Sequence, residues 1–346
     1  MEEVTAATTC LPLVRDEAWL PVEETAHVGR IRRTATALTQ RLGFTANRTA
    51  EVGLAVTEIG TNLHKHARQG VVLIRTVRGE RDAAVEVVAV DRGPGIGDIA
   101  LAWQDGQSTT GTLGVGLGAV ARLATSCSMT SRLGSGTALV ARFAPTKVWT
   151  PEWGVESAAG ITRPINGEEV CGDAYAFCRG ADRMTLMMCD GSGHGPLAAA
   201  ASDTAVRLFR DLAPMPPDQL VTRLHQALRG TRGGAVAVAD IDLVARTVRY
   251  CGLGNIAGAV LAGDRKQGMI SVPGVAGHQA RTIRAFDYPL PDRAVVALHS
   301  DGLTERWGVD FGADLVQDEP VLIATTLLRE AGVRNDDASV LVARPA

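Results

Sequence analysis

The stretch Leu186-Met-Met-Cys-Asp190-Gly-Ser-Gly-His-Gly195 joins a short apolar run to an aspartate and then to three glycines within five residues. An apolar run of this length predicts a buried strand, and the glycines allow the backbone to turn tightly beside something small. We therefore expect a strand that delivers the Asp190 carboxylate to the mouth of a site.

Other aspartates occupy matching positions at the edges of apolar runs. Asp173 precedes one such run, Asp301 ends another, and Asp336 and Asp337 lie just before the last one. A single Asp-Gly pair is more often a simple turn. The ordered set is better explained by a divalent-cation site, because Mg²⁺ and Mn²⁺ prefer carboxylate, carbonyl and water oxygens.

These motifs also resemble those of a known family, the stage II sporulation protein E-type phosphatases, bacterial relatives of the type 2C metal-dependent serine/threonine phosphatases. The resemblance covers roughly residues 155–346 and rests on four motifs in order: Gly172-Asp173, Asp190–Gly195, Ser300-Asp-Gly-Leu-Thr-Glu305 and Asp336–Ser339. One departure is Cys171, which stands where the family usually has a second glycine.

The resemblance implies a two-ion phosphatase site with Mn²⁺ or Mg²⁺. Asp173, Asp190 and Asp301 would be the catalytic metal ligands, Asp336 would complete one metal shell, and the Gly191 carbonyl would add a ligand. A metal-activated water would then attack the phosphorus of a phosphoserine in line. His194 would contact phosphate, relay a proton or merely pack in the turn, so it stays outside the catalytic set.

Composition limits the class of protein. The chain has 346 residues, enough for two domains, with 46% hydrophobic and 21% charged residues, as in ordinary globular proteins. A net charge of −3 without a basic cluster argues against a nucleic-acid partner. No apolar run reaches about 18 residues and the N-terminus lacks a basic signal region, so we expect a cytoplasmic protein without a membrane segment. Six scattered cysteines argue against a zinc site and a disulfide framework.

The first half of the chain predicts two helices, over residues 23–42 and about 47–68, from apolar residues at intervals of three and four. Glu58 and Asn62 lie four apart on the second helix and should project side by side. His64 and His66 lie only two apart and diverge, so they do not chelate one metal.

Strands over 71–77 and 83–90 follow, and the second runs into Asp91-Arg-Gly-Pro-Gly95. A polar loop, 103–112, leads to a glycine-rich stretch and a helix expected at 119–125. Glycines before a helix suit phosphate binding at its N-terminus. A dinucleotide site is disfavoured, since a polar loop precedes the glycines and no acid follows between residues 119 and 151.

Together these segments resemble the ATP-binding fold of gyrase-type ATPases and histidine kinases. Their motif sequences are most similar to those of the small bacterial anti-sigma and switch-protein serine kinases. The resemblance covers residues 20–145. It implies that Glu58 is the base for an acceptor serine, that Asn62 binds Mg²⁺ with ATP, and that Asp91 accepts a hydrogen bond from adenine near Thr137. The remaining nucleotide-binding positions are Gly93, Gly95, Gly111, Gly114, Gly116 and Gly118.

We expect an α+β protein of two domains. Residues 1–145 would form a two-layer α/β sandwich of the histidine-kinase-type ATPase fold. Residues 146–158 would be a linker, either a packed joint or a tether, and residues 159–346 a four-layer α-β-β-α sandwich of the metal-dependent phosphatase fold.

The expected function is a bifunctional signalling regulator that dephosphorylates an anti-anti-sigma-type switch phosphoprotein and phosphorylates a partner serine. A second hypothesis makes the first domain an ATP-binding module that sequesters a partner, such as a sigma factor or a stressosome-like component, without kinase activity. A third makes the second domain a pseudo-phosphatase, which the retained aspartates disfavour.

Overall fold

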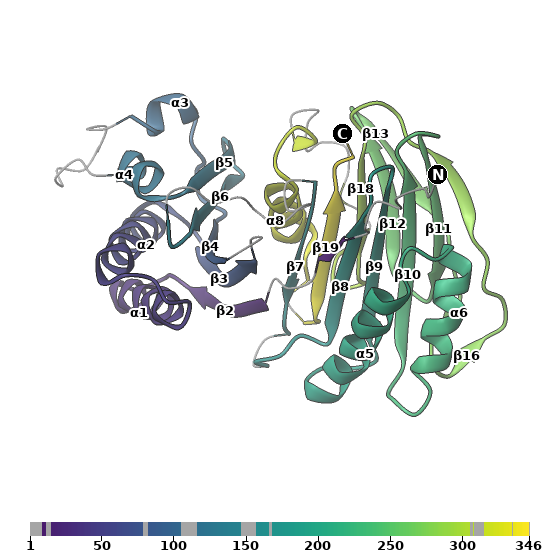
Figure 1. Ribbon diagram of the computed structural model, residues 1–346. Coiled ribbons are helices and arrows are strands. Elements are labelled where there is room, and N and C mark those ends of the chain that lie inside the picture. The colour runs from purple at the N-terminus through teal and green to yellow at the C-terminus, as the bar shows by residue number, and fades with distance from the viewer. Residues whose placement is uncertain are drawn as a thin grey trace, which may run out of the picture. The chain divides into compact units, whose positions relative to one another are not determined.

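The computed structural model in Figure 1 describes residues 9–11, 15–78, 82–104, 116–146, 157–165, 168–304, 307, 315–333 and 335–345. It divides into two compact units, Leu13–Glu152 and Met1–Pro12 joined with Trp153–Ala346. Among the described helices, none is long and apolar enough to cross a membrane.

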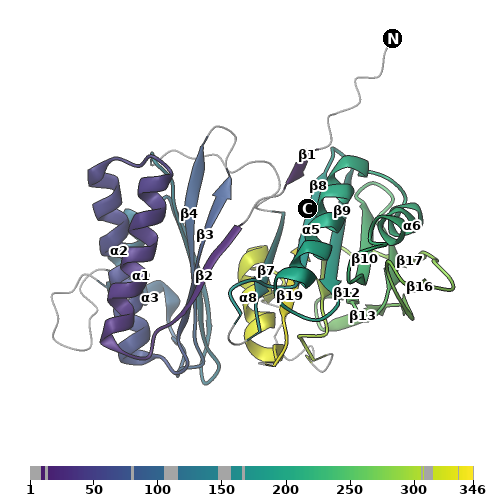
Figure 2. The same cartoon turned by 90° about the horizontal axis from the view of Figure 1, so that it is seen from below.

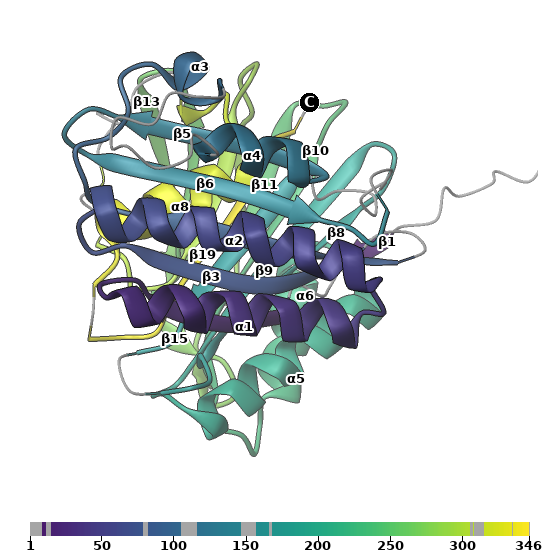
Figure 3. The same ribbon diagram turned by 90° about the vertical axis from the view of Figure 1, so that its left-hand side faces the viewer.

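The N-terminal unit is an antiparallel five-stranded sheet with helices on one face, as Figures 2 and 3 show. Apolar side chains of the two long helices and of one sheet face form its core. The expected two-layer sandwich is therefore confirmed. In sheet order the strands are β2 (Arg15–Pro21), β3 (Val71–Arg78), β4 (Ala83–Val90), β6 (Gly136–Phe143) and β5 (Ser126–Arg132), and the helices are α1 (Thr25–Arg41), α2 (Ala46–His66), α3 (Ile99–Ala102) and α4 (Gly116–Leu123).

Helix α2 begins where its sequence supplies a cap. The Thr45 side chain accepts a hydrogen bond from the Arg48 backbone N–H, which satisfies one of the free donors of the first turn. The two long helices pack closely at Gly60, where an added Cβ would lie 2.4 Å from Ile31 Cδ1. This packing fixes the helix that carries Glu58.

A buried charge cluster crosses the middle of the same sheet. Glu86 on β4 lies opposite Arg75 on β3 and Arg142 on β6, with distances of 2.7 and 2.6 Å between its carboxylate oxygens and the two guanidinium Nε atoms. Burial alone raises the pKa of Glu86, but the two arginines outweigh it, and the net pKa is lowered. The carboxylate is therefore held in its charged form.

The second unit contains two stacked sheets, and helices cover their outer faces (Figures 1 and 2). One core fills the space between the sheets, and another lies between the larger sheet and helices α5 (Pro196–Leu212) and α6 (Pro217–Ala227). Helix α8 (Pro320–Ala331) packs on the smaller sheet. The expected α-β-β-α sandwich is confirmed.

The larger sheet has the order β1-β8-β9-β10-β11-β14, with β17 also pairing with β11, and the smaller one has the order β13-β12-β18-β19-β7. The larger-sheet strands are β1 (Thr9–Leu11), β8 (Asp173–Arg179), β9 (Arg183–Gly191), β10 (Gly234–Asp242), β11 (Thr247–Leu253), β14 (Ser271–Val272) and β17 (Phe286–Pro289). The smaller-sheet strands are β13 (Arg265–Met269), β12 (Ala257–Ala262), β18 (Val295–His299), β19 (Ala338–Ala343) and β7 (Ala158–Arg163), and β15 (Gly274–Val275) pairs with β16 (Gln279–Ala280).

One sequence prediction about an element was wrong, and one run that reads as a single strand is divided between two sheets. Residues 269–272 do not form one strand, because β13 ends at Met269 in one sheet and β14 begins at Ser271 in the other, with Ile270 56% exposed between them. Helix α4 begins at Gly116, three residues earlier than expected. Gly116 and Gly118 therefore lie inside its first turn.

The N-terminal segment and the cysteines also require a correction. Strand β1 pairs antiparallel with β8, so residues 9–11 belong to the second unit, although the expected first domain began at residue 1. Cys10 and Cys178 lie opposite each other and form a disulfide. Local spacing could not predict this pair, because 168 residues separate the two cysteines and only the strand pairing brings them together.

Candidate functional site

Asp173 and Asp190 are direct neighbours across two antiparallel strands. Asp173 begins β8, Asp190 is the last residue but one of β9, and the register pairs the two residues. Opposed residues of an antiparallel pair project their side chains to the same face. The two carboxylates predicted from separate motifs therefore share one site, with Asp173 only 5% exposed.

The smaller sheet supplies the other acids. Asp301 follows β18, Asp336 and Asp337 precede β19, and these two strands are paired. The carboxyl groups of Asp173, Asp301 and Asp336 lie close enough to Asp190 for their charges to act on it. The chain thus brings acids from four strand ends of two sheets to one place.

Asp336 and Asp337 have different surroundings. Asp337 is 3% exposed, and its two carboxylate oxygens accept hydrogen bonds from the backbone N–H groups of Ile165 and Gly172, each at 2.7 Å. Asp336 is half-buried, and its Oδ1 accepts from the Asp337 N–H at 2.9 Å. Asp337 therefore ties segments together, and Asp336 keeps an oxygen for another ligand.

The carboxylates destabilise one another's charged forms. Burial raises the pKa of Asp173 to about 7 and that of Asp190 to about 9, and the charges of neighbouring aspartates add to both shifts. Burial and the charge of Asp336 also raise the pKa of Asp301. Cations bound among these carboxylates would offset their mutual repulsion.

The donor set fits divalent metal ions. Asp173 Oδ2 is buried and has no hydrogen-bond partner among the described residues, as expected of an oxygen kept for a ligand. The Gly191 backbone is packed tightly, since an added Cβ would lie 2.3 Å from the Ala198 carbonyl oxygen. Within the described ranges, no three His, Cys, Asp or Glu side chains already surround one ion position. Carbonyl and water oxygens would have to complete any shell.

Asn255 belongs to the site, although the sequence analysis did not select it. It lies between β11 and β12, and its Nδ2 donates a hydrogen bond to Asp301 Oδ2 at 2.6 Å. The turn depends on Gly254, whose φ is +108° and whose added Cβ would lie 2.5 Å from Ala235 Cβ. In the sequence, the only local sign of Asn255 was its place in a Gly-Asn pair directly after an apolar run.

His194 is held by a carboxylate that was also not selected. Its Nδ1 lies 2.9 Å from Glu168 Oε1, and the His194 side chain is 58% exposed. Since Glu168 orients the ring from one side, the other ring nitrogen is left toward solvent beside the loop that follows Asp190.

In the N-terminal unit the predicted ATP-site residues come from three elements. Glu58 and Asn62 are half-buried on α2, and among the described residues neither has a hydrogen-bonded or ionic partner. Asp91 follows β4, and its N–H donates to the Thr137 carbonyl oxygen at 3.0 Å. The sheet thus places Asp91 beside Thr137.

The glycines of this region have specific steric roles. Gly93 N–H donates to Asp91 Oδ1 at 2.6 Å, and an added Cβ on Gly93 would lie 3.1 Å from the His66 carbonyl oxygen at the end of α2. Gly95 has a φ of +73°, and an added Cβ would lie 2.2 Å from the Arg132 carbonyl oxygen. Gly111 and Gly114 lie outside the described residues.

Ser131 is a further polar group here that the sequence analysis missed. Its Oγ lies 2.8 Å from Thr137 Oγ1 and accepts a hydrogen bond from the Ile96 N–H at 2.8 Å. It therefore links the strand pair β5–β6 to the segment that follows Asp91. The sequence around Ser131 did not indicate a role in this site, because only strand pairing brings it beside Thr137.

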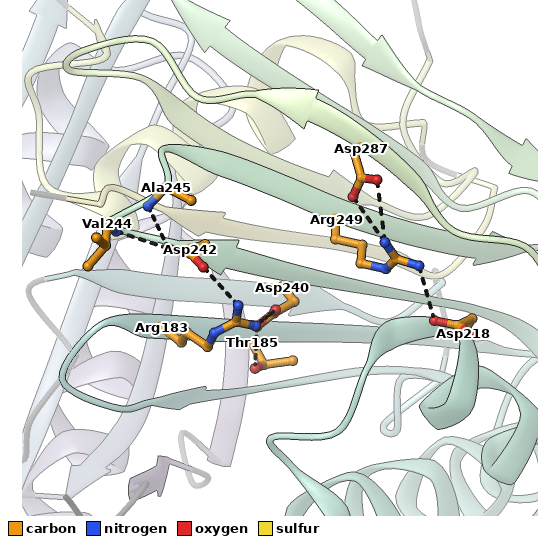
Figure 4. A network of polar contacts seen from close by, with 9 residues as sticks. All are labelled: Arg183, Thr185, Asp218, Asp240, Asp242, Val244, Ala245, Arg249 and Asp287. Atoms are coloured by element: carbon orange, nitrogen blue, oxygen red, sulfur yellow. Dashed lines mark hydrogen bonds and ion pairs between the residues drawn. The ribbon is translucent and has the colours of Figure 1, made fainter.

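A second polar network lies on the larger sheet, at the opposite end of β9 from Asp190 (Figure 4). Arg183 binds Asp240 and also Asp242, the latter at 2.8 Å, and Arg249 lies 3.4 Å from Asp287 and 3.8 Å from Asp218. A pocket of about 460 Å³ opens beside it, walled by residues 214–219. Each carboxylate of this network faces a guanidinium, so we assign it to the structure of the sheet.

Comparisons with known proteins place each unit. The model of the histidine kinase-like ATPase domain family matches residues 21–143, and that of stage II sporulation protein E (SpoIIE) matches residues 180–345. The serine/threonine-protein kinase RsbT of Bacillus subtilis (strain 168) is 34% identical over 110 residues, which are 32% of this chain and 83% of that protein.

Two further similarities concern the second unit. The phosphoserine phosphatase RsbX of the same organism is 27% identical over 90 residues, 26% of this chain and 45% of RsbX, so the match spans less than half of that protein. A solved structure from work on the bacterial stressosome as a modular system controlling secondary messenger signalling is 26% identical, with a TM-score of 0.50 over 54% of this chain and 98% of that one.

Proposed function

We propose that the chain is a bifunctional regulator of protein phosphorylation. The premise is that the N-terminal unit belongs to the histidine kinase-like ATPase domain family and that the other unit is a SpoIIE-type serine phosphatase domain. The phosphatase unit would remove phosphate from a serine or threonine of a partner protein. The ATP-binding unit would phosphorylate a partner serine.

The observation that supports the phosphatase most strongly is the convergence of four acids that form no ion pair with the described residues. Asp173, Asp190, Asp301 and Asp336, with the Gly191 carbonyl, would hold two Mn²⁺ or Mg²⁺ ions. When bound, these ions supply an activated water and neutralise charge on the phosphoryl group.

The neighbouring residues would orient the ligand set. Asn255 would fix one oxygen of Asp301 so that the other remains available, and Asp337 would hold the segment before β19 against Gly172. Glu168 would orient His194 toward the leaving serine or the phosphate.

The substrate we propose is an anti-anti-sigma-type switch phosphoprotein. Such a partner fits a chain that joins both activities, because its phosphoserine would be formed by one unit and hydrolysed by the other. The similarities to a kinase and a phosphoserine phosphatase of one organism support this pairing.

In the ATP-binding unit, Glu58 would activate the acceptor serine, Asn62 would bind Mg²⁺ with ATP, and Asp91 would accept a hydrogen bond from the adenine amino group. The half-buried, unpartnered state of Glu58 and Asn62 among the described residues supports this reading. Positioning and charge neutralisation account for most of phosphoryl transfer.

A second candidate function is an ATP-binding module that sequesters its partner without kinase activity. The variant Glu58→Ala separates the two, because loss of partner phosphorylation with intact ATP binding supports the kinase. If the unaltered chain binds ATP but transfers no phosphate to any switch protein, the sequestering function replaces it.

The test of the phosphatase is hydrolysis of an aryl phosphate by the full chain with Mn²⁺, with a chelator, and in Asp190→Asn. Metal-dependent turnover that Asp190→Asn removes is expected. Turnover that persists in the chelator or in the variant would contradict the proposal. Asp240→Asn, at the other end of the same strand pair, is the matched control.

A further inference from the structure

The loop after Asp190 faces an arginine that none of the motifs includes. The register of β9 and β10 pairs Gly191 with Gly234, and the Ser192 N–H donates to the Gly233 carbonyl oxygen at 2.9 Å. Continued by one step, this pairing places Arg232 opposite Gly193. An added Cβ on Gly193 would lie 3.0 Å from Arg232 Nη1, so the guanidinium lies over this loop.

The backbone that carries Arg232 is fixed on several sides. The Gly233 N–H donates to Thr231 Oγ1 at 2.9 Å, and the Thr231 hydroxyl donates to the Leu228 carbonyl oxygen at 2.7 Å. His278 Nε2 lies 3.0 Å from the Arg232 carbonyl oxygen. A long side chain on such a fixed backbone loses less freedom on binding than one on a loose loop.

The guanidinium itself is unused. Arg232 is exposed, and in the described part of the chain its side chain has neither an ion pair nor a hydrogen bond. The arginines of the network in Figure 4, by contrast, each face carboxylates. Arg232 thus keeps its donors for a ligand, three residues beyond the Asp190 position in the strand pairing.

Charge balance identifies the kind of ligand. The aspartates at 173, 190, 301, 336 and 337 carry five negative charges when ionised, and two divalent ions supply four positive ones. Counted over these aspartates and the two ions alone, the loaded site remains negative, and a phosphate monoester dianion entering it needs a cation on its outer side. A planar guanidinium suits two phosphoryl oxygens.

We propose that Arg232, lying over Gly193, is the phosphoryl-binding residue of this site and holds the non-bridging oxygens of a phosphate monoester. Gly193 is part of the same subsite, because its φ of +85° favours glycine and an added Cβ would crowd the guanidinium. The inference rests on the proposed phosphatase function for its substrate, although binding of the anion does not require turnover.

The test measures binding of inorganic phosphate to the full-length, Mg²⁺-loaded protein by calorimetry, with hydrolysis of an aryl phosphate measured in parallel. Arg232→Gln should weaken phosphate binding by about tenfold to a hundredfold, as expected for a lost charge-assisted hydrogen bond, and raise KM with less effect on kcat. Arg232→Lys should recover part of the binding.

Arg229→Gln is the matched control, because Arg229 is exposed in the same loop and its removal changes the net charge equally. Phosphate affinity that is equal in Arg232→Gln and the unaltered chain, or equally reduced in both variants, would overturn the inference. Unaltered melting temperatures exclude misfolding as the cause. Arg232-dependent phosphate binding without any hydrolysis would support the subsite and count only against the proposed enzyme.

Discussion

The two ends of strand β9 use the same residue type in opposite ways. At the Arg183 end, Asp240 and Asp242 both face the Arg183 guanidinium, and Asp240 also accepts a hydrogen bond from Thr185 at 3.2 Å. At the other end Asp190 faces Asp173 and Asp301, and among the described residues the charges that act most strongly on it are those of Asp173, Asp301 and Asp336. Among the described residues, one end of β9 therefore lies in an acid cluster neutralised by arginine and the other end in a cluster that is not.

The difference separates acids that stabilise the fold from acids kept for a ligand. A carboxylate that meets a guanidinium is satisfied within the chain. Buried carboxylates that meet one another oppose folding unless they hold protons or cations. Motif spacing alone does not distinguish the two kinds of acid, but the partners of each carboxylate in the structure do.

The largest effect expected concerns Asp190→Asn. The variant removes a proposed metal ligand and should lower the proposed metal-dependent phosphatase activity by more than about 100-fold. It also removes one of the crowded acid groups, so the metal-free protein should not be less stable than the unaltered chain. Activity assays with Mn²⁺ and urea unfolding in chelator measure the two effects, and a variant that is both active and destabilised would reverse the assignment.

Asn255→Ala should have the next largest effect. Its amide donates to Asp301 Oδ2, and loss of such an outer hydrogen bond typically costs about 10–100-fold in metal affinity or activity. Half-saturating Mn²⁺ concentration and direct Mn²⁺ binding by electron paramagnetic resonance both report it. Unchanged Mn²⁺ binding would show that the hydrogen bond only shapes the turn.

Much of the fold could be predicted from local patterns. Helix α2 follows from its apolar spacing and the Thr45 cap, and the strand that ends at Asp190 follows from its apolar run. Strand β1 and the Cys10–Cys178 disulfide could not be predicted, because they depend on pairing between segments that lie far apart in sequence. The switch of sheets at Ile270 also depends on tertiary packing, since the run from Met269 reads as one strand.

The candidate site shows the same limit. Its acids were selected because each lies at the end of an apolar run, a local signal. Asn255 and Arg232 were missed because each is an ordinary polar residue in a loop until the sheets place it beside Asp301 or Gly193. Adjacent Asp336 and Asp337 could be told apart only by their hydrogen-bond partners.

Asp240→Asn tests the neutralised end of the comparison. The variant removes the charge that Arg183 meets at a buried position, and it should destabilise the protein by about 1–3 kcal/mol while leaving phosphatase activity unchanged. Urea unfolding and the aryl phosphate assay measure this. Lost activity with full stability would instead connect this end of the sheet to catalysis.

The last prediction concerns the dependence of stability on pH in metal-free protein. Burial and neighbouring charges raise the pKa values of Asp173 and Asp190 to about 7 and about 9, so the folded state keeps protons that the unfolded chain has released above about pH 4. Raising the pH through this window therefore favours unfolding, by up to about 1.4 kcal/mol per pH unit for each proton. Chelated protein should lose stability between about pH 5 and about pH 8, and Asp190→Asn should reduce the slope. Saturating Mg²⁺ should remove this slope, because bound cations replace the protons.

A slope of the opposite sign in chelator would mean that these acids are already neutralised within the chain. Asp242, at the other end of the strand pair, is an acid of that kind, because a backbone hydrogen bond from Ala245 and the charge of Arg183 lower its pKa.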